Sequence, residues 1–221
     1  MSWHEDFSNK IFDSLDDVKR RGALEKAVSN FMTKKYLLID SNVELRYYLK
    51  RLREVKSRSI EYIQDLQGQF RENLEGLGGI VHLASNGAEA NEIVARIMGD
   101  RDLAVKGKSM TTEEIGLNEH LERAGKSIIE TDLGERILQA SGEKGSHIVV
   151  PAVHIPRERV AEILSETLHQ DLPPEPIVLT RAVRESLRGI WMKAEVGITG
   201  ANGLIADTGS IVIVENEGNA R

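Results

Sequence analysis

The sequence contains no cysteine, and this absence excludes more functions than any other feature of its composition. Disulfide bonds, thiolate nucleophiles, classical structural zinc sites and cysteine-ligated iron–sulfur clusters all require thiol side chains. None of them can form within these 221 residues. A redox centre that works with this chain must therefore belong to another segment or partner, or be a cofactor bound without thiolate ligands.

Long apolar runs and an excess of positive charge are also missing. No apolar stretch approaches the roughly 20 residues that cross a bilayer, so we expect no membrane span. The formal net charge of −6 gives no general reason to bind nucleic acid or an anionic membrane. The start, Met1 to Asp6, has neither the basic flank nor the apolar stretch of a secretory signal. These features predict a cytoplasmic protein.

The apolar pattern changes near Gly78, which predicts an N-terminal helical segment over residues 1–78 and an α/β domain over residues 79–221. In the first segment we expect one helix over about residues 7–32 and one or two long helices over residues 42–75. One face of the long helix carries an apolar stripe at helical spacing. The stripe consists of Leu45, Leu49, Leu52 and Val55.

In the second segment, short apolar runs alternate with capped helices. This alternation predicts an α/β fold with a Rossmann-like layered sheet that has many parallel neighbours. The expected strands cover residues 80–84, 103–106, 127–130, 147–150, 197–200 and 211–214. The expected helix starts are a capping box of Thr111 and Glu114 for a helix ending at Gly125, a cap at Asp132, Pro156 at the first helical position, and a helix over residues 177–193.

Polar residues gather where the predicted strands end, and ligands of open α/β sheets bind at the carboxyl ends of strands. The lysine-containing turn after residue 106 runs into a helix start, where free N–H groups and the helix dipole attract anions. We therefore predict a site for a small carboxylate or phosphate. Its candidate residues are Lys106, Lys108, Ser109, Thr111, Glu114, Glu130, Asp132, His154, Thr199, Asn202, Asp207, Thr208, Glu217 and Asn219.

Each of these motifs also has a purely structural interpretation. The lysines are compatible with a solvated surface beside a capped helix, and Glu130 and Asp132 with acid–base chemistry or with simple capping. The glycine-rich segments around Thr199 and Thr208 suit a ligand loop or a plain turn equally well. His154 has no partner at metal-ligand spacing, which favours a hydrogen-bonded imidazole, and we expect no metal site.

Six ordered blocks of the sequence resemble the lactate utilisation protein B family. The first reads Lys-Gly-Lys-Ser-Met-Thr-Thr-Glu-Glu-Ile-Gly-Leu-Asn, and the third reads Val-Pro-Ala-Val-His. The resemblance extends from about Gly79 to the last residue, and the helical segment before it is compatible. The blocks cover residues 106–118, 130–135, 150–154, 197–202, 207–209 and 215–221.

The resemblance implies an N-terminal lactate-utilisation (LUD) domain of the superfamily that contains ribose-phosphate isomerase, glucosamine-phosphate deaminase and CoA-transferases. It implies a cytoplasmic multi-subunit system that oxidises L-lactate to pyruvate. Members of the family normally continue into a cysteine-rich region that holds four-iron four-sulfur clusters. This sequence stops at Arg221 without such a region, so we expect an incomplete domain and electron transfer outside this chain.

Three functions are compatible with these observations, and no catalytic residue can be transferred from the family. The first is a domain that binds a small carboxylate or a partner subunit within a lactate-oxidising complex. The second is an independent phosphosugar or CoA-transferase-like enzyme, in which Glu215 or Glu217 would be a carboxylate nucleophile. The third is a non-catalytic assembly module, which an exposed stripe from Leu45 to Val55 would support.

Overall fold

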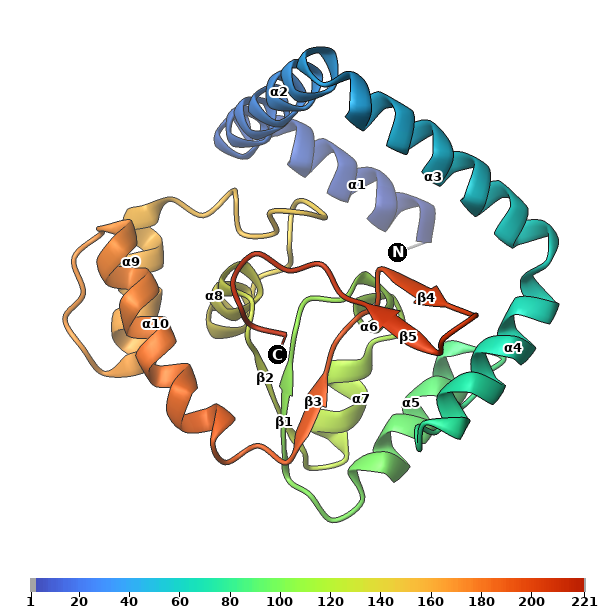
Figure 1. Cartoon of the computed structure of the whole chain (residues 1–221). Helices are drawn as coiled ribbons and strands as arrows, with labels where there is room; N and C mark the ends of the chain where they lie inside the picture. Colours follow the sequence, from blue (N-terminus) through green and yellow to red (C-terminus); the bar gives the residue numbers. More distant parts are fainter. Residues whose placement is uncertain (1–2, 221) are drawn as a thin grey trace.

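A three-stranded parallel sheet forms the centre of the α/β part of the molecule (Figure 1). The computed structural model describes residues 3–220, with side chains described from Phe7 onward. The strands are β1 (Leu103–Lys106), β2 (Ser127–Glu130) and β3 (Val196–Ile198), in the order β2-β1-β3. The mixed α/β class and the first two of these strands confirm the prediction, although the described sheet is smaller than the sequence suggested.

Helices cover both faces of this sheet. Ala104 and Ile128 join a buried cluster with α5 (Gly87–Met98) and α7 (Leu117–Arg123). Because side chains alternate along a strand, the next residue, Ile129, packs in a second cluster on the opposite face. That second cluster is formed mainly by α9 (Arg157–Leu168) and α10 (Pro176–Trp191). The result is a layered α/β/α arrangement.

Two predicted strands are not strands in the structure. Residues 80–84 form an irregular connection between α4 (Ile63–Gly76) and α5, and Ile80 and Leu83 are exposed. Residues 147–150 form bends, with Ile148 and Val149 exposed. Neither segment hydrogen-bonds to the sheet, so a short apolar run alone was an insufficient signal for a strand.

The helix starts also differ in detail from the prediction. Ser109, and not Thr111, is the N-cap of the short helix α6 (Met110–Glu114), since its hydroxyl accepts the Thr112 N–H. Gly116 adopts a left-handed conformation with φ of 64° and separates α6 from α7, so the single expected helix is broken in two. Pro156 lies one position earlier than expected, at the N-cap of α9.

Asp132 caps α8 (Leu133–Ser141) as predicted, by accepting the Glu135 N–H at 3.2 Å. The expected helix over residues 177–193 is confirmed as α10, with Pro176 in its first turn. The cap at Asp132 was predictable because capping depends on a local spacing of three residues, which the sequence shows directly.

A second, two-stranded sheet lies beside the carboxyl ends of the parallel strands. It is the antiparallel hairpin β4 (Gly203–Ile205) and β5 (Ser210–Val212). Asn73 on α4 donates its side-chain N–H to the carbonyl of Ala206 at 2.7 Å, which fastens the hairpin turn to this helix. α4 therefore packs against the α/β part, although it precedes the predicted boundary at residue 78. That boundary stays a prediction.

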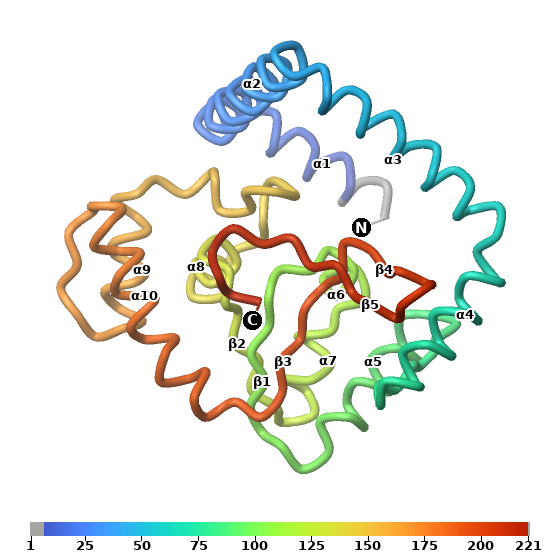
Figure 2. The backbone as a smooth tube through the Cα atoms, viewed as in Figure 1, coloured from blue at the N-terminus to red at the C-terminus, as the bar shows by residue number. Residues whose placement is uncertain are grey.

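Three helices at the start of the chain form an arm that rises from α4 and arches past the α/β part in the view of Figure 2. They are α1 (Trp3–Asp16), α2 (Val18–Ser41) and α3 (Val43–Glu61), which we call the N-terminal arm. The single helix expected over residues 7–32 is thus two helices, and the break lies at Asp17, the N-cap of α2. No residue from Phe7 to Gln69 is buried. Within residues 3–220, no helix combines the length and apolarity needed to cross a membrane.

Candidate functional site

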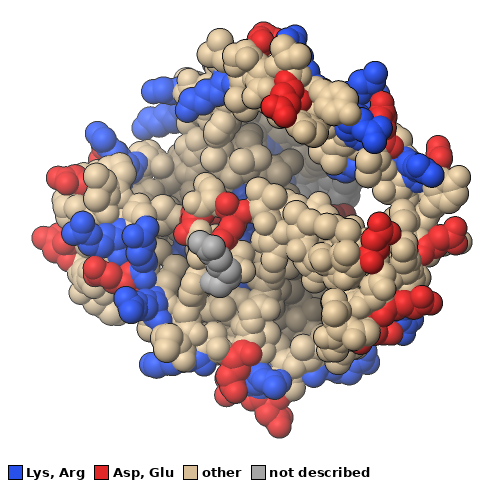
Figure 3. Space-filling view, in the orientation of Figure 1, with Lys and Arg blue, Asp and Glu red and all other residues tan. Residues whose placement is uncertain are grey.

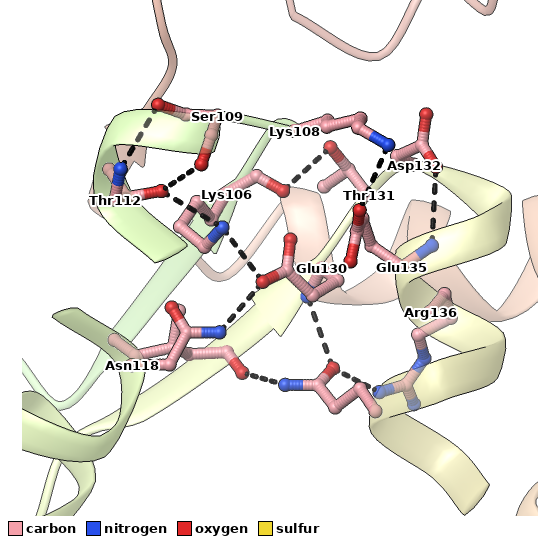
Figure 4. A network of polar contacts seen from close by, with 12 residues as sticks. Lys106, Lys108, Ser109, Thr112, Asn118, Glu130, Thr131, Asp132, Glu135 and Arg136 are labelled. Atoms are coloured by element: carbon pink, nitrogen blue, oxygen red, sulfur yellow. Dashed lines mark hydrogen bonds and ion pairs between the residues drawn. The ribbon is translucent and has the colours of Figure 1, made fainter. Parts of the chain in front are cut away.

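A buried ion pair joins the carboxyl ends of the neighbouring strands β1 and β2 (Figure 4). Lys106 is the last residue of β1, Glu130 is the last residue of β2, and the two are direct neighbours in the parallel register. Their Nζ and Oε1 atoms lie 2.8 Å apart, and their side chains are only 1% and 6% exposed. The pair therefore lies buried at the strand ends, where the sequence predicted a ligand site.

Neighbouring side chains complete the coordination of this pair. Asn118 on α7 donates to Glu130 Oε1 at 2.7 Å, and Lys106 donates to the Thr112 hydroxyl at 3.3 Å. Burial raises the pKa of Glu130, and this effect outweighs the opposite influence of Lys106 and Asn118. The second carboxylate oxygen of Glu130 has no hydrogen-bond partner among the described residues. Asn118 was not predicted as a site residue, because it stands within a helix and not at a strand end.

The second lysine of the predicted motif is also paired with a carboxylate. Lys108 Nζ lies 3.2 Å from Glu135 Oε1, without the alignment of a hydrogen bond. Glu135 is buried in the first turn of α8, whereas the Lys108 side chain remains 21% exposed. Lys106 is thus sealed in the interior, whereas the Lys108 side chain is partly exposed and ends in a buried Nζ atom that has no hydrogen-bond partner among the described residues.

A cavity of about 530 Å³ opens next to Lys108, and we call it the rim cavity. It lies where the chain leaves β1 and β3, between the loop before α6, the start of α8 and the segment after β5. The structure brings together seven of the predicted residues in its lining. They are Lys108, Ser109, Thr111, Asp132, Thr199, Asn202 and Asn219.

Several of these polar groups already have partners inside the protein. Asn202 Oδ1 accepts the Val214 N–H at 2.7 Å, and the Asn219 side chain donates to the Thr131 hydroxyl at 3.4 Å. Among the described residues, Lys108 is the one lysine or arginine in the cavity lining, which also contains the carboxylates Asp132 and Glu215. The lining therefore offers one positive group, two negative groups and several neutral hydroxyls and amides.

His154 does not reach the rim cavity. Its Nδ1 lies 2.7 Å from the Ser146 hydroxyl, and its Nε2 lies 3.2 Å from Glu143 Oε2. The side chain is 7% exposed. The imidazole thus holds together two parts of the loop before α9, as expected for a hydrogen-bonded histidine.

Asp207, Thr208 and Glu114 also lie outside the rim cavity. Asp207 accepts a hydrogen bond from Gln69 on α4 at 3.1 Å, and the Thr208 hydroxyl donates to Ser210 within the same turn. Glu114 is exposed at the end of α6. The predicted gathering of Thr208 with Lys108 is therefore wrong, because the hairpin carries its turn away towards α4 (Figure 1).

Glu217 lies against the start of α8 instead of in the cavity lining. Its Oε2 accepts the Leu133 N–H at 3.2 Å. Partial burial raises the pKa of this carboxyl, and the nearby charge of Asp132 raises it further. Two acidic groups thus share one helix N-terminus.

A second cavity, of about 810 Å³, was not predicted from the sequence. Burial, followed by the charge of Glu135, raises the pKa of Glu113 in its wall. The spacing of acidic residues along α6 and α7 was a signal that could have indicated it. Six glutamates line this second cavity: Glu113, Glu119, Glu122, Glu130, Glu135 and Glu143.

The site residues do not suit a metal ion or an iron–sulfur cluster. In the described part of the chain, no three His, Cys, Asp or Glu side chains are grouped so that they could hold a metal. The sequence also has no cysteine to ligate the clusters that the family resemblance implied. We therefore assign no step to such a group within this chain.

Comparison with known proteins identifies the family. Residues 68–221 match the LUD domain family, so the match starts within α4, earlier than expected. Lactate utilization protein B of Bacillus thuringiensis (strain Al Hakam), Bacillus cereus (strain AH187) and Bacillus anthracis (strain CDC 684 / NRRL 3495) are each 34% identical over 216 residues. These residues are 97% of this chain and 46% of each relative, so the chain spans slightly less than half of their length. No solved structure matches the chain. Because the match covers most of the sequence, the chain belongs to the LUD domain family.

Proposed function

We propose that this chain takes part in L-lactate utilisation and that the rim cavity binds a small carboxylate of the lactate and pyruvate type. One observation carries this proposal: polar groups from four separate segments converge on a single cavity at the carboxyl ends of the strands. The name of the relatives, lactate utilization protein B, supplies the substrate class.

Lys108 is the group that we expect to bind the carboxylate of the ligand. It is the lysine of the cavity lining, and its present partner, Glu135, lies at 3.2 Å without hydrogen-bond alignment. An aligned, charge-assisted hydrogen bond to a ligand would be stronger than this contact. The lysine would then exchange one carboxylate for another, with no net loss of ion pairing.

The acidic residues of the lining favour a 2-hydroxy acid over a ligand that carries only negative groups. Asp132 and Glu215 line the same cavity as Lys108. A carboxylate accepts hydrogen bonds but repels a phosphate or a second carboxylate. A hydroxyl beside the bound carboxylate, as in L-lactate, would supply the hydrogen that one of these acids accepts.

The wider system is part of the same proposal. The relatives are about twice as long as this chain, so their complete activity involves residues that this chain does not contain. We propose that electron transfer, through four-iron four-sulfur clusters, resides outside these 221 residues, on other subunits or segments of a cytoplasmic lactate-oxidising complex. We also propose kinship with the isomerase, deaminase and CoA-transferase superfamily, which the layered sheet is compatible with.

Isothermal titration calorimetry with L-lactate, pyruvate and inorganic phosphate tests the cavity. We expect binding of L-lactate, weaker binding of phosphate, and a loss of at least about tenfold in L-lactate affinity in Lys108→Ala, since a hydrogen bond to a charged group contributes about 1.5–3 kcal/mol. The exposed lysine after α10 gives a matched control, and Lys193→Ala should bind like the parent. Absence of heat with every ligand, or equal affinity in the two variants, would contradict the proposal.

Acyl transfer is a second candidate function, because one of the two possible carboxylate nucleophiles lines the rim cavity. Glu215 is part of the lining, and its Oε2 accepts the Ala220 N–H at 2.8 Å. Its carboxylate would attack the thioester carbonyl of an acyl-CoA, form a mixed anhydride and release the CoA thiolate. Incubation with acetyl-CoA followed by borohydride reduction should then convert Glu215 to an alcohol. An unchanged peptide mass would remove this candidate.

A further inference from the structure

The N-terminal arm exposes an apolar surface that no described residue covers. Leu49, Leu52 and Val55 on α3 are 43%, 54% and 53% exposed, and they form the stripe that the sequence predicted. We call them, with Leu45, the arm stripe. An amphipathic helix is normally stabilised by burial of such a face against another element. In Figure 3 the arm stands apart from the α/β body, with a hollow between them.

A second exposed apolar surface lies on the β4–β5 hairpin. Leu204 and Ile211 are more than half exposed, and Val214 just after the hairpin is 73% exposed. We call this surface the hairpin face. It consists of Leu204 and Ile211, which are direct neighbours in the antiparallel register and share one face of the hairpin. Exposed apolar surface of this kind marks an interaction site on a folded protein.

The two parts of the chain carry opposite charge. Residues 1–61 contain 13 Lys and Arg against 10 Asp and Glu, whereas residues 62–221 contain 16 against 25. The arm is therefore positive by three charges and the remainder is negative by nine. Opposite net charge favours association of an arm with the body of another molecule.

We propose that two copies of this chain form a two-fold symmetric dimer in which the arm stripe of each copy packs on the hairpin face of the other. Two-fold symmetry lets the same pair of surfaces meet twice, so both apolar faces of both copies become covered. The arrangement also brings each positive arm beside a negative body.

Pairing of the two arms with each other is the less favourable arrangement. Arg46, Lys50 and Arg53 form a basic face of α3 that points away from the arm stripe. The arm as a whole carries three net positive charges, so contact of two arms would bring like charges together. It would also leave the hairpin face exposed. The body of the second copy is therefore the better partner for the arm.

The proposed dimer also affects the rim cavity. Ile213, two residues after Ile211, lines the rim cavity. An arm from the second copy would thus lie at the edge of the cavity, so a monomeric variant should also bind the ligand more weakly. This consequence rests on the proposed function, whereas the dimer itself does not.

Sedimentation equilibrium or light scattering measures the assembly directly. We expect twice the 24.6 kDa of one chain for the parent, with weaker association at high salt because part of the attraction is between opposite charges. Leu49→Glu with Leu52→Glu, and separately Ile211→Glu, should give the mass of one chain. Ser57→Glu, on the opposite side of α3, adds a charge without touching the stripe and should remain dimeric. Circular dichroism verifies that each variant is folded.

The absence of cysteine allows the contact to be mapped without background reaction. Leu52→Cys chains mixed with Ile211→Cys chains should give a covalent dimer with a short bismaleimide. Neither chain alone should do so at a comparable rate. Efficient cross-linking of Leu52→Cys chains by themselves would indicate arm-to-arm pairing and overturn the proposed contact. If the parent has the mass of one chain over the whole concentration range, the proposal of a dimer is overturned. The arm would then be covered by another partner or by none.

Discussion

The ammonium group of Lys106 lies 2.8 Å from the carboxylate of Glu130, and both side chains are almost completely buried at adjacent strand ends. Removal of two charges from water is costly, and their mutual attraction offsets this cost only while both partners are present. The pair therefore determines how substitutions at the end of the sheet affect stability, whatever ligand the neighbouring cavity binds.

Loss of one partner of this pair should be severe. Glu130→Gln leaves the buried ammonium group of Lys106 without its counter-charge, and we expect a loss of about 3–5 kcal/mol in the free energy of unfolding. The double variant Lys106→Met with Glu130→Leu should lose less than Glu130→Gln, since it buries no charge. Urea denaturation measures both, and an equal or larger loss in the double variant would contradict this account. As a control, Arg51→Ala breaks an exposed ion pair with Glu54 and should change stability by less than about 1 kcal/mol.

Gly209 should tolerate no side chain. Its φ is +68°, and a Cβ atom at this position would lie 2.6 Å from the backbone nitrogen of Leu74 on α4. We expect Gly209→Ala to destabilise the contact between hairpin and α4 by at least about 1–2 kcal/mol. Faster amide hydrogen exchange in β4 and β5 would report it. Gly203→Ala, whose Cβ meets only Val212 at 3.9 Å, is the control and should leave exchange nearly unchanged.

Glu217 should make stability fall as the pH rises above about 4.5, the ordinary pKa of its carboxyl. Its raised pKa means that the folded protein holds the proton more tightly than the unfolded chain does. The contribution is thus present at low pH and is lost as the pH rises through the raised pKa. Glu217→Gln keeps an acceptor for the Leu133 N–H and should become more stable relative to the parent over this range. Asp132→Asn, which retains a capping side chain, should reduce the effect, and parallel curves for the parent and Glu217→Gln would refute it.

Release of Lys108 should strengthen ligand binding if the rim cavity holds a carboxylate. Glu135→Gln removes the charge that competes for Lys108 at 3.2 Å. We expect L-lactate affinity to rise about two- to fivefold, which corresponds to the energy of a partly exposed ion pair. The same titration on Glu195→Gln, at an exposed glutamate before β3, should give the parent value. A weaker affinity in Glu135→Gln would mean that Glu135 positions Lys108 for the ligand.

The candidate site was predictable where it depends on strand ends. Lys106 and Glu130 close two neighbouring parallel strands, so their approach follows from the topology that the apolar pattern indicated. Thr208 and Asp207 were not predictable, because the path of the hairpin is fixed by contacts of its turn with Gln69 and Asn73 on α4. Those contacts join residues more than 130 positions apart, and no local pattern encodes them.

The sequence by itself determined the α/β class, the absence of thiol chemistry, the caps at residues such as Asp132 and the long arm helices with their apolar stripe. These features depend on residue type and on spacings of two to four positions. Only the tertiary structure decided that the Lys106 side chain is sealed while that of Lys108 is partly exposed, and that the segments 80–84 and 147–150 stay outside the sheet. Burial and strand pairing are properties of the neighbours in space: Lys106 ends β1 inside the sheet, whereas Lys108, two positions later, lies in the loop before α6.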